Sequence, residues 1–310
     1  MKDRTASLWA MIAAFSVQSV LAHGDSSKPQ DAHDLWRAWE FDPLVVLGLA
    51  VSAIFYTAGL SRLWKATRVG SGIRRWHAAA FAVGWLAAFV ALVSPLHPLG
   101  RVLFSAHMTQ HEILMLVAAP LMVLGRPLIV FLWALPNQTA RRLSAYTKAP
   151  GWQSAWRAIS HPLSAWLIHL FALWIWHVPA LFEATIDNEF VHALQHTSFL
   201  FSALLFWWAV LHGREKVLGY GMGVLYIFTT ALHNGILGAI LTFTKTLWYP
   251  AYAETASWGL TPLEDQQLGG LIMWIPAGVV YIVAGLALFA GWLQEAEIRA
   301  AQKELAPAKG

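Results

Sequence analysis

The sequence predicts an all-α, polytopic membrane protein, a bundle of seven transmembrane helices after an N-terminal signal peptide. Of the 310 residues, 57% are apolar or aromatic and only 12% are Asp, Glu, Lys or Arg, about half the charged share of a soluble domain. Several uncharged apolar stretches have about 20 residues, the length that crosses a hydrocarbon core of about 30 Å. Because a backbone in lipid must satisfy its own hydrogen bonds, we expect these stretches to be helices.

Residues 1–22 have the features of a secretory signal peptide. Lys2 and Arg4 form the charged start, residues 8–20 the apolar stretch, and residues 20–22 a plausible small-residue cleavage site. An uncleaved N-terminal anchor is the alternative. Residues 23–42 are polar, carry five acidic residues and are expected to lie outside the membrane.

Seven apolar spans follow in one membrane domain, residues 43–294, before a polar tail, residues 295–310. The spans are expected at 43–61, 76–95, 102–124, 162–178, 190–211, 217–243 and 268–292. The apolar stretch 127–135 begins with Pro127 and is too short to cross a bilayer. We therefore expect it to be interfacial.

The distribution of Lys and Arg between alternate loops predicts the orientation. Loops 62–75, 125–161 and 212–216 and the tail together carry fifteen of these residues, whereas the opposite side carries four. Basic residues accumulate on the cytoplasmic side, so the mature N-terminus is expected to be periplasmic and the C-terminus cytoplasmic. The basic isoelectric point thus reflects topology, and nothing in the sequence indicates nucleic-acid binding.

The chain contains no cysteine, which limits its chemistry. Disulfides, thiolate-bound zinc, iron–sulfur clusters and cysteine nucleophiles are excluded. A bound metal ion would have to be held by His, Met or carboxylate side chains.

Histidines concentrate on the outer side of the predicted bundle. With the orientation above, six share that leaflet: His97, His107, His111, His177, His192 and His196. Two pairs, His107/His111 and His192/His196, have i, i+4 spacing, which stacks two rings on one helix face about 6 Å apart. Neutral imidazole suits copper, zinc, iron or nickel.

Met115 extends the first histidine face at i+8, and its soft thioether suits Cu(I). We therefore expect a metal centre, with copper as the metal, formed by His107, His111, His192 and His196, with His177 next and Met115 as an auxiliary ligand. A packing role is the alternative for any lone histidine or methionine in a span.

Four further polar residues could support such a centre: Gln110, Glu112, Asp265 and Gln266. Glu112 is the only Asp, Glu, Lys or Arg inside the predicted spans, so it could orient a ligand or lie in a helix interface. Residues 111–115 are not an HExxH zinc-protease motif, since the second histidine is missing. Asp265 and Gln266 directly precede the last span, where they could cap a helix or supply an oxygen ligand.

Several stretches resemble the CtaG-type cytochrome c oxidase assembly factors, multi-span proteins of bacterial plasma membranes associated with the caa-type oxidase. The resemblance is carried by HMTQHEILMLVAAPLMVLGRP (107–127), HPLSAWLIHLFALWIWHVPALF (161–182), HALQHTSFLFSALLFWW (192–208) and LTPLEDQQLGGLIMWIPAG (260–278). These stretches are spread over nearly all of the mature chain.

The resemblance implies an assembly factor for a respiratory haem–copper oxidase that acts at the copper-insertion stage, without turnover of its own. Its partners would be cytochrome c oxidase subunits, periplasmic copper chaperones and the lipid bilayer. The family pattern carries onto His107, Gln110, His111, Pro120, Pro127, His177, Pro179, His192, His196, Asp265, Gln266, Gly270 and Trp274. Glu112 departs from it, since an apolar residue or Met is expected there, which puts an essential role for this carboxylate in doubt.

Three alternatives to a copper-binding assembly factor stay open. The two histidine pairs could hold haem or a di-iron centre in a redox protein, although di-iron sites usually need more carboxylate than Glu112. A copper or small-solute transporter is less well supported, because the sequence has no inverted repeat. A scaffold that binds oxidase subunits without any metal is the last alternative.

Overall fold

The computed structural model describes residues 35–212, 219–253 and 255–305, and all regular secondary structure within them is helical. The predicted signal peptide, residues 1–22, lies outside the described residues. The prediction of an all-α membrane bundle is confirmed.

Six helices are long and apolar enough to cross a membrane. They are α2 (Pro43–Ala66), α3 (Arg75–Val93), the continuous helix Phe104–Leu124, α12 (Glu189–His212), α13 (Gly219–Phe243) and α14 (Pro262–Leu305). A seventh span is formed if α9 (Pro150–Ser160) and α10 (Pro162–Trp176), which are bent by 58°, count as one. Each of the seven predicted spans corresponds to one of these helices or to the bent pair α9 and α10.

The bend between α9 and α10 has a local cause. A proline forces the residue before it out of the helical region, and His161, which precedes Pro162, is extended with φ −61° and ψ 135°. α10 alone has 15 residues, so the fourth predicted span, 162–178, is shorter than a full crossing.

The third span changes its helix type in the middle. It begins as α5 (Phe104–Glu112), continues as the π-helix η3 (Ile113–Ala118) and ends as α6 (Ala119–Leu124). Pro120 has no N–H to donate and its ring would collide with the carbonyl one turn back, which the wider π turn accommodates. Such π turns are frequent at functional sites, and this one begins two residues after His111.

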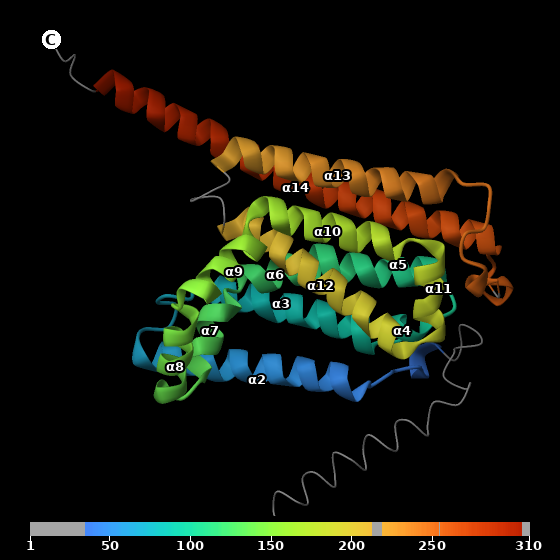
Figure 1. Ribbon diagram of the computed structural model, residues 1–310, viewed down its shortest axis with the longest axis horizontal. Helices are drawn as coiled ribbons and strands as arrows, with labels where there is room; N and C mark the ends of the chain where they lie inside the picture. The colour runs from blue at the N-terminus through green and yellow to red at the C-terminus, as the bar shows by residue number, and fades with distance from the viewer. Residues whose placement is uncertain (1–34, 213–218, 254, 306–310) are drawn as a thin grey trace, which may run out of the picture.

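The third span and α12 form the centre of the bundle. Inside the protein, 61% of the apolar window of the third span and 56% of that of α12 are buried, against 11% for α2. α5 packs on α14, and α6 packs on both α3 and α12. The remaining spans surround this pair, with α13 beside α14 along one edge and α2 along the other (Figure 1).

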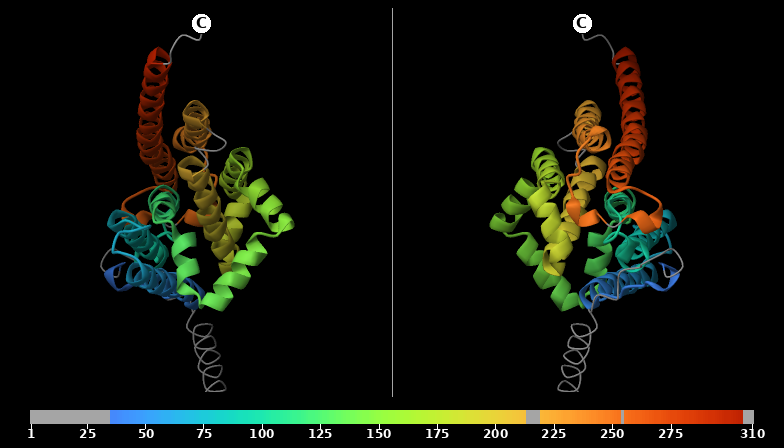
Figure 2. Two further views of the ribbon diagram at one scale, coloured as in Figure 1. Left: turned by 90° about the vertical axis from the view of Figure 1, so that its left-hand side faces the viewer. Right: turned by 90° about the vertical axis from the view of Figure 1, so that its right-hand side faces the viewer.

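Short helices close the two ends of the bundle. α4 (Leu96–Leu99) and α11 (Pro179–Asp187) lie at one end, and α7 (Pro127–Ala134) and α8 (Asn137–Thr147) lie with α9 at the other (Figure 1). The helix α7 corresponds to the stretch 127–135, which is expected from its length to be interfacial. α14 continues past the predicted end of the last span, and its C-terminal part extends beyond the other helices (Figure 2).

Candidate metal centre

Five histidines from three elements meet at the end of the bundle that carries α4 and α11. His97 lies on α4, His107 and His111 on α5, and His192 and His196 on the first turns of α12. They form two groups of three in which the ligand nitrogens lie within 4.8 Å of one another: His97/His192/His196 and His107/His111/His196. The structure thus brings together all four of the principal ligands expected from the sequence.

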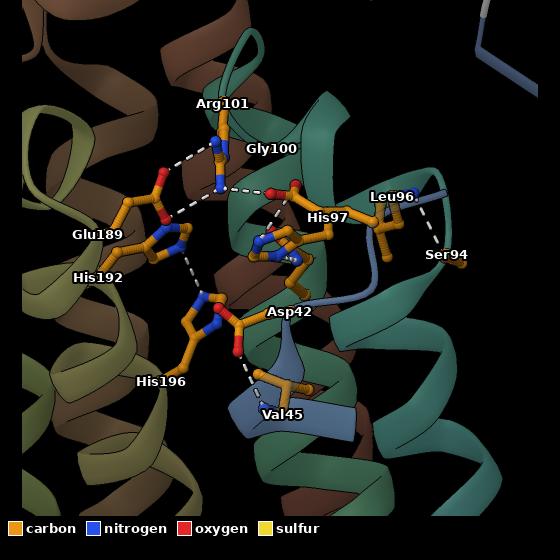
Figure 3. A network of polar contacts seen from close by, with 12 residues as sticks. Asp42, Val45, Ser94, Leu96, His97, Gly100, Arg101, Glu189, His192 and His196 are labelled. Atoms are coloured by element: carbon orange, nitrogen blue, oxygen red, sulfur yellow. Dashed lines mark hydrogen bonds and ion pairs between the residues drawn. The ribbon is translucent and has the colours of Figure 1, made fainter. Parts of the chain in front are cut away.

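His192 and His196 present their Nε2 atoms to each other, 3.2 Å apart (Figure 3). Two nitrogens bound to one ion at about 2 Å with a tetrahedral angle lie about 3.3 Å apart. The pair therefore already has the separation of two ligands of a common metal ion.

Among the five clustered histidines, His111 is the one whose two ring nitrogens are both buried and unpartnered within the described residues. It is 1% exposed, and neither of its ring nitrogens has a hydrogen-bond partner among the described residues. Burying a polar group without a partner is costly. A metal ion shared with His107 and His196 would satisfy one of these nitrogens.

His107 is held in place on both sides of its ring. Its Nε2 lies 3.0 Å from Oε1 of Gln195, and its Nδ1 lies 3.3 Å from the Gly100 carbonyl and 3.3 Å from the Tyr252 hydroxyl. These contacts engage both ring nitrogens and fix the orientation of the ring, so a metal ion bound to His107 would replace one of them. Tyr252 itself donates to the Gly100 carbonyl, which ties α4, α5 and the loop before α14 together.

His97 is positioned by a hydrogen bond with the side-chain amide of Gln110. The Gln110 amide nitrogen lies 2.7 Å from the Ala91 carbonyl, which fixes the orientation of the amide, and 3.0 Å from Nδ1 of His97. Nδ1 therefore accepts a hydrogen bond, and the ring proton of neutral His97 is on Nε2, which faces Glu40 at 3.7 Å. Burial, helped by nearby His192 and Arg101, lowers the pKa of His97 well below its usual value, so this ring is neutral at pH 7.

His177, which directly follows α10, is in neither group of three. Its Nδ1 donates to the Leu173 carbonyl at 2.6 Å, which leaves the lone pair of Nε2 free. Nε2 is buried and without a hydrogen-bond partner among the described residues. This is the tautomer of a metal-ligating histidine, and its role as a further ligand stays a prediction.

Met115 and Glu112 lie on the same span as His107 and His111. Met115 is in the π turn, its side chain is part of the largest buried apolar cluster, and its carbonyl accepts a hydrogen bond from Trp207. Glu112 is buried, and its Oε2 has no partner among the described residues. Glu112 is in neither group of three.

Asp265 and Gln266 support the site without facing a ligand position. The Asp265 carboxylate accepts hydrogen bonds from the backbone of Phe104 at 2.6 Å and from the backbone and hydroxyl of Ser105 at 3.2 and 2.5 Å. It therefore caps α5, the neighbouring helix, rather than its own. Gln266 binds the loop before α14 through Trp248 and Thr246.

A small cavity of about 120 Å³ has His97, His192 and His196 in its lining. Glu40, Asp42 and Glu189 line it together with Arg101, which forms ion pairs of 3.0 Å with both Glu40 and Glu189 (Figure 3). Three carboxylates and one guanidinium leave this cavity with an excess of negative charge, which favours cations.

Two supporting residues were missed by the sequence interpretation. Gln195, between His192 and His196, forms the hydrogen bond that positions His107. Arg101 lies in an outer loop and was counted only for topology. The fully polar face of the stretch 192–196 was the one signal that could have indicated Gln195.

Comparisons with known proteins identify the family. The family described as cytochrome c oxidase caa3 assembly factor (Caa3_CtaG) matches residues 54–295. The chain belongs to this family. The match includes all five clustered histidines, so the caa3 assembly factor family is defined over a region that contains the candidate metal centre.

The curated relatives are distant in sequence and are longer than this chain. The chain is 26% identical over 308 aligned residues to the uncharacterized protein Mb0105 of Mycobacterium bovis, and 25% identical over 292 to the uncharacterized protein ML1998 of Mycobacterium leprae. The alignments cover 94% and 91% of this chain but only 44% and 43% of these relatives, so the chain spans less than half of their length. No solved structure matches the chain.

Proposed function

We propose that this caa3 assembly factor binds copper through its clustered histidines and delivers it to a haem–copper oxidase during assembly. The observation that carries the proposal is the buried group His107, His111 and His196, in which His111 has two unpartnered ring nitrogens. His192 belongs to the second group, with His97 and His196, and its Nε2 lies 3.2 Å from that of His196, the residue that both groups share.

Copper is the metal that this donor set and this family favour together. Neutral imidazole binds both Cu(I) and Cu(II), and the chain has no cysteine that would favour a thiolate-bound ion. A site of imidazoles alone carries no negative charge, which suits an ion that is to be passed on rather than kept.

The arrangement suits a delivery role at a membrane surface. The histidines lie at one end of the bundle, at a cavity with excess negative charge, and we place this end at the periplasmic face of a bacterial inner membrane. Copper would arrive there from a periplasmic chaperone and leave toward an oxidase subunit in the same bilayer.

Metal analysis of the purified protein tests the proposal. After copper loading and dialysis, the wild-type protein is expected to retain copper, and His111→Ala and His196→Ala variants are expected to lose it. His233→Ala is the matched control, because His233 is also buried on a transmembrane helix with two unpartnered nitrogens but is in neither histidine group. Equal copper content in wild-type protein and in both folded cluster variants would refute copper binding at this site.

An optical spectrum and a cellular assay complete the test. A Soret band in the purified protein would instead favour haem ligation by the same histidines. In cells that lack the chain, the copper content of the caa3 oxidase is expected to fall, and the wild-type gene but not the His111→Ala variant should restore it.

A further inference from the structure

Two adjoining cavities lie at the end of the bundle opposite to the histidines. The larger, about 830 Å³, is an open groove between α2, α7, α8 and α9 and is lined by apolar side chains such as Phe131, Leu143 and Trp156. The smaller, about 630 Å³, lies between α7 and α8. Leu132 and Leu135 line both cavities, so the two are neighbours, and each has the volume of a small-molecule site.

The charged groups that line these cavities are all cationic. Arg157 lines the larger cavity, and Arg141 and Lys148 line the smaller one. No Asp or Glu occurs anywhere between Glu112 and Glu183. None of the three cations forms an ion pair within the described part of the chain, so their charge is uncompensated.

Nothing in the described structure covers the helices that form this surface. α8 and α9 contain no buried residue, although they expose Leu143, Tyr146, Trp152 and Trp156. Helices with an apolar face and Lys or Arg on the other face lie in the interface between headgroups and acyl chains. The cavities therefore open where lipid headgroups meet the protein.

We propose that these cavities form a binding site for an anionic phospholipid. One acyl chain would occupy the apolar cavity between α2, α7, α8 and α9, and the phosphate would interact with Arg157, Arg141 and Lys148. Basic pockets between membrane helices select anionic headgroups in this way. A lipid is favoured over a protein segment because the site combines an open apolar groove with cations and lies at the membrane surface.

Competition between two lipids tests the proposal. The full chain, purified in a mild detergent, is mixed with equal amounts of dioleoylphosphatidylglycerol and dioleoylphosphatidylcholine, and retained lipids are quantified by native mass spectrometry. Wild-type protein is expected to retain phosphatidylglycerol in preference, and each of Arg141→Gln, Lys148→Gln and Arg157→Gln should lower that preference by about 5-fold. Arg142→Gln is the matched control, because Arg142 lines neither cavity.

Two further measurements test separately whether the acyl chain and the phosphate contribute to lipid binding. Leu143→Trp, which fills the larger cavity, is expected to reduce retention of both lipids. Millimolar inorganic phosphate should not displace phosphatidylglycerol if the acyl chain contributes to binding. Equal retention of the two lipids by wild-type protein, displacement by phosphate, or an equal loss in Arg142→Gln would each overturn the proposal, whether or not the chain binds copper.

Discussion

At the scale of single residues, the histidines of the cluster are not equivalent. His111 has two free ring nitrogens, whereas the Nδ1 of His97 already accepts a hydrogen bond from Gln110 and its protonated Nε2 faces Glu40. A metal ligand needs a free lone pair. The hydrogen-bond pattern therefore separates His111, whose two ring nitrogens are free, from His97, whose two ring nitrogens are engaged.

Copper affinity should follow this division. We expect His111→Ala to lower copper affinity by more than about 100-fold, whereas His97→Ala should cost about 10-fold or less, which is the lower range for a supporting partner of a ligand. Competition with a copper chelator of known affinity measures both. A larger loss in His97→Ala than in His111→Ala would contradict the assignment.

The carboxylate of Asp265 should matter mainly for stability. Asp265→Ala removes three hydrogen bonds from the start of α5, two of them to backbone N–H groups, and should destabilise the protein by roughly 2–3 kcal/mol. The thermal unfolding midpoint in detergent measures the effect. Glu264→Ala, one residue away, removes two hydrogen bonds from Thr261 on the exposed surface and should lower the midpoint less than Asp265→Ala, whose carboxylate is buried.

At the scale of elements, close helix packing depends on small residues at particular positions. A side chain at Gly59 of α2 would collide with the carbonyl of Val130 on α7, whereas nothing lies near Gly48 on the same helix. Small residues let membrane helices approach closely. The contact between α2 and α7 therefore requires glycine at position 59 but not at position 48.

A pair of substitutions in α2 tests this contact. Gly59→Ala is expected to destabilise the protein by about 1–3 kcal/mol through overpacking. Gly48→Ala should be neutral or stabilise by up to about 1 kcal/mol, because alanine has the higher helix propensity. The thermal unfolding midpoints of both variants in the same detergent measure this difference. Equal midpoints would show that α7 is free to move away from α2.

At the scale of the whole molecule, charge divides the bundle into two ends. The histidine end carries the cavity with three carboxylates, and the opposite end carries Arg141, Arg142, Lys148 and Arg157 on exposed short helices. The positive end is the one expected in the cytoplasm. The same asymmetry thus relates the orientation, the proposed copper site and the proposed lipid site.

The absence of cysteine makes the orientation simple to measure. Ser257→Cys, in the exposed turn η6 (Ala256–Trp258) before α14, should react with a membrane-impermeant maleimide added to intact spheroplasts. Ser71→Cys, in the exposed loop between α2 and α3, should react only after lysis. The reverse pattern would place the histidines on the cytoplasmic side.

The sequence by itself determined the helical membrane fold, the order of the spans and the two histidine pairs, because hydropathy and i, i+4 spacing are local properties. Only the tertiary structure decided that both pairs meet, that His97 joins them and that Asp265 caps α5. These features depend on which helices are neighbours and how they are rotated about their axes, and neither is encoded in the pattern of any single span.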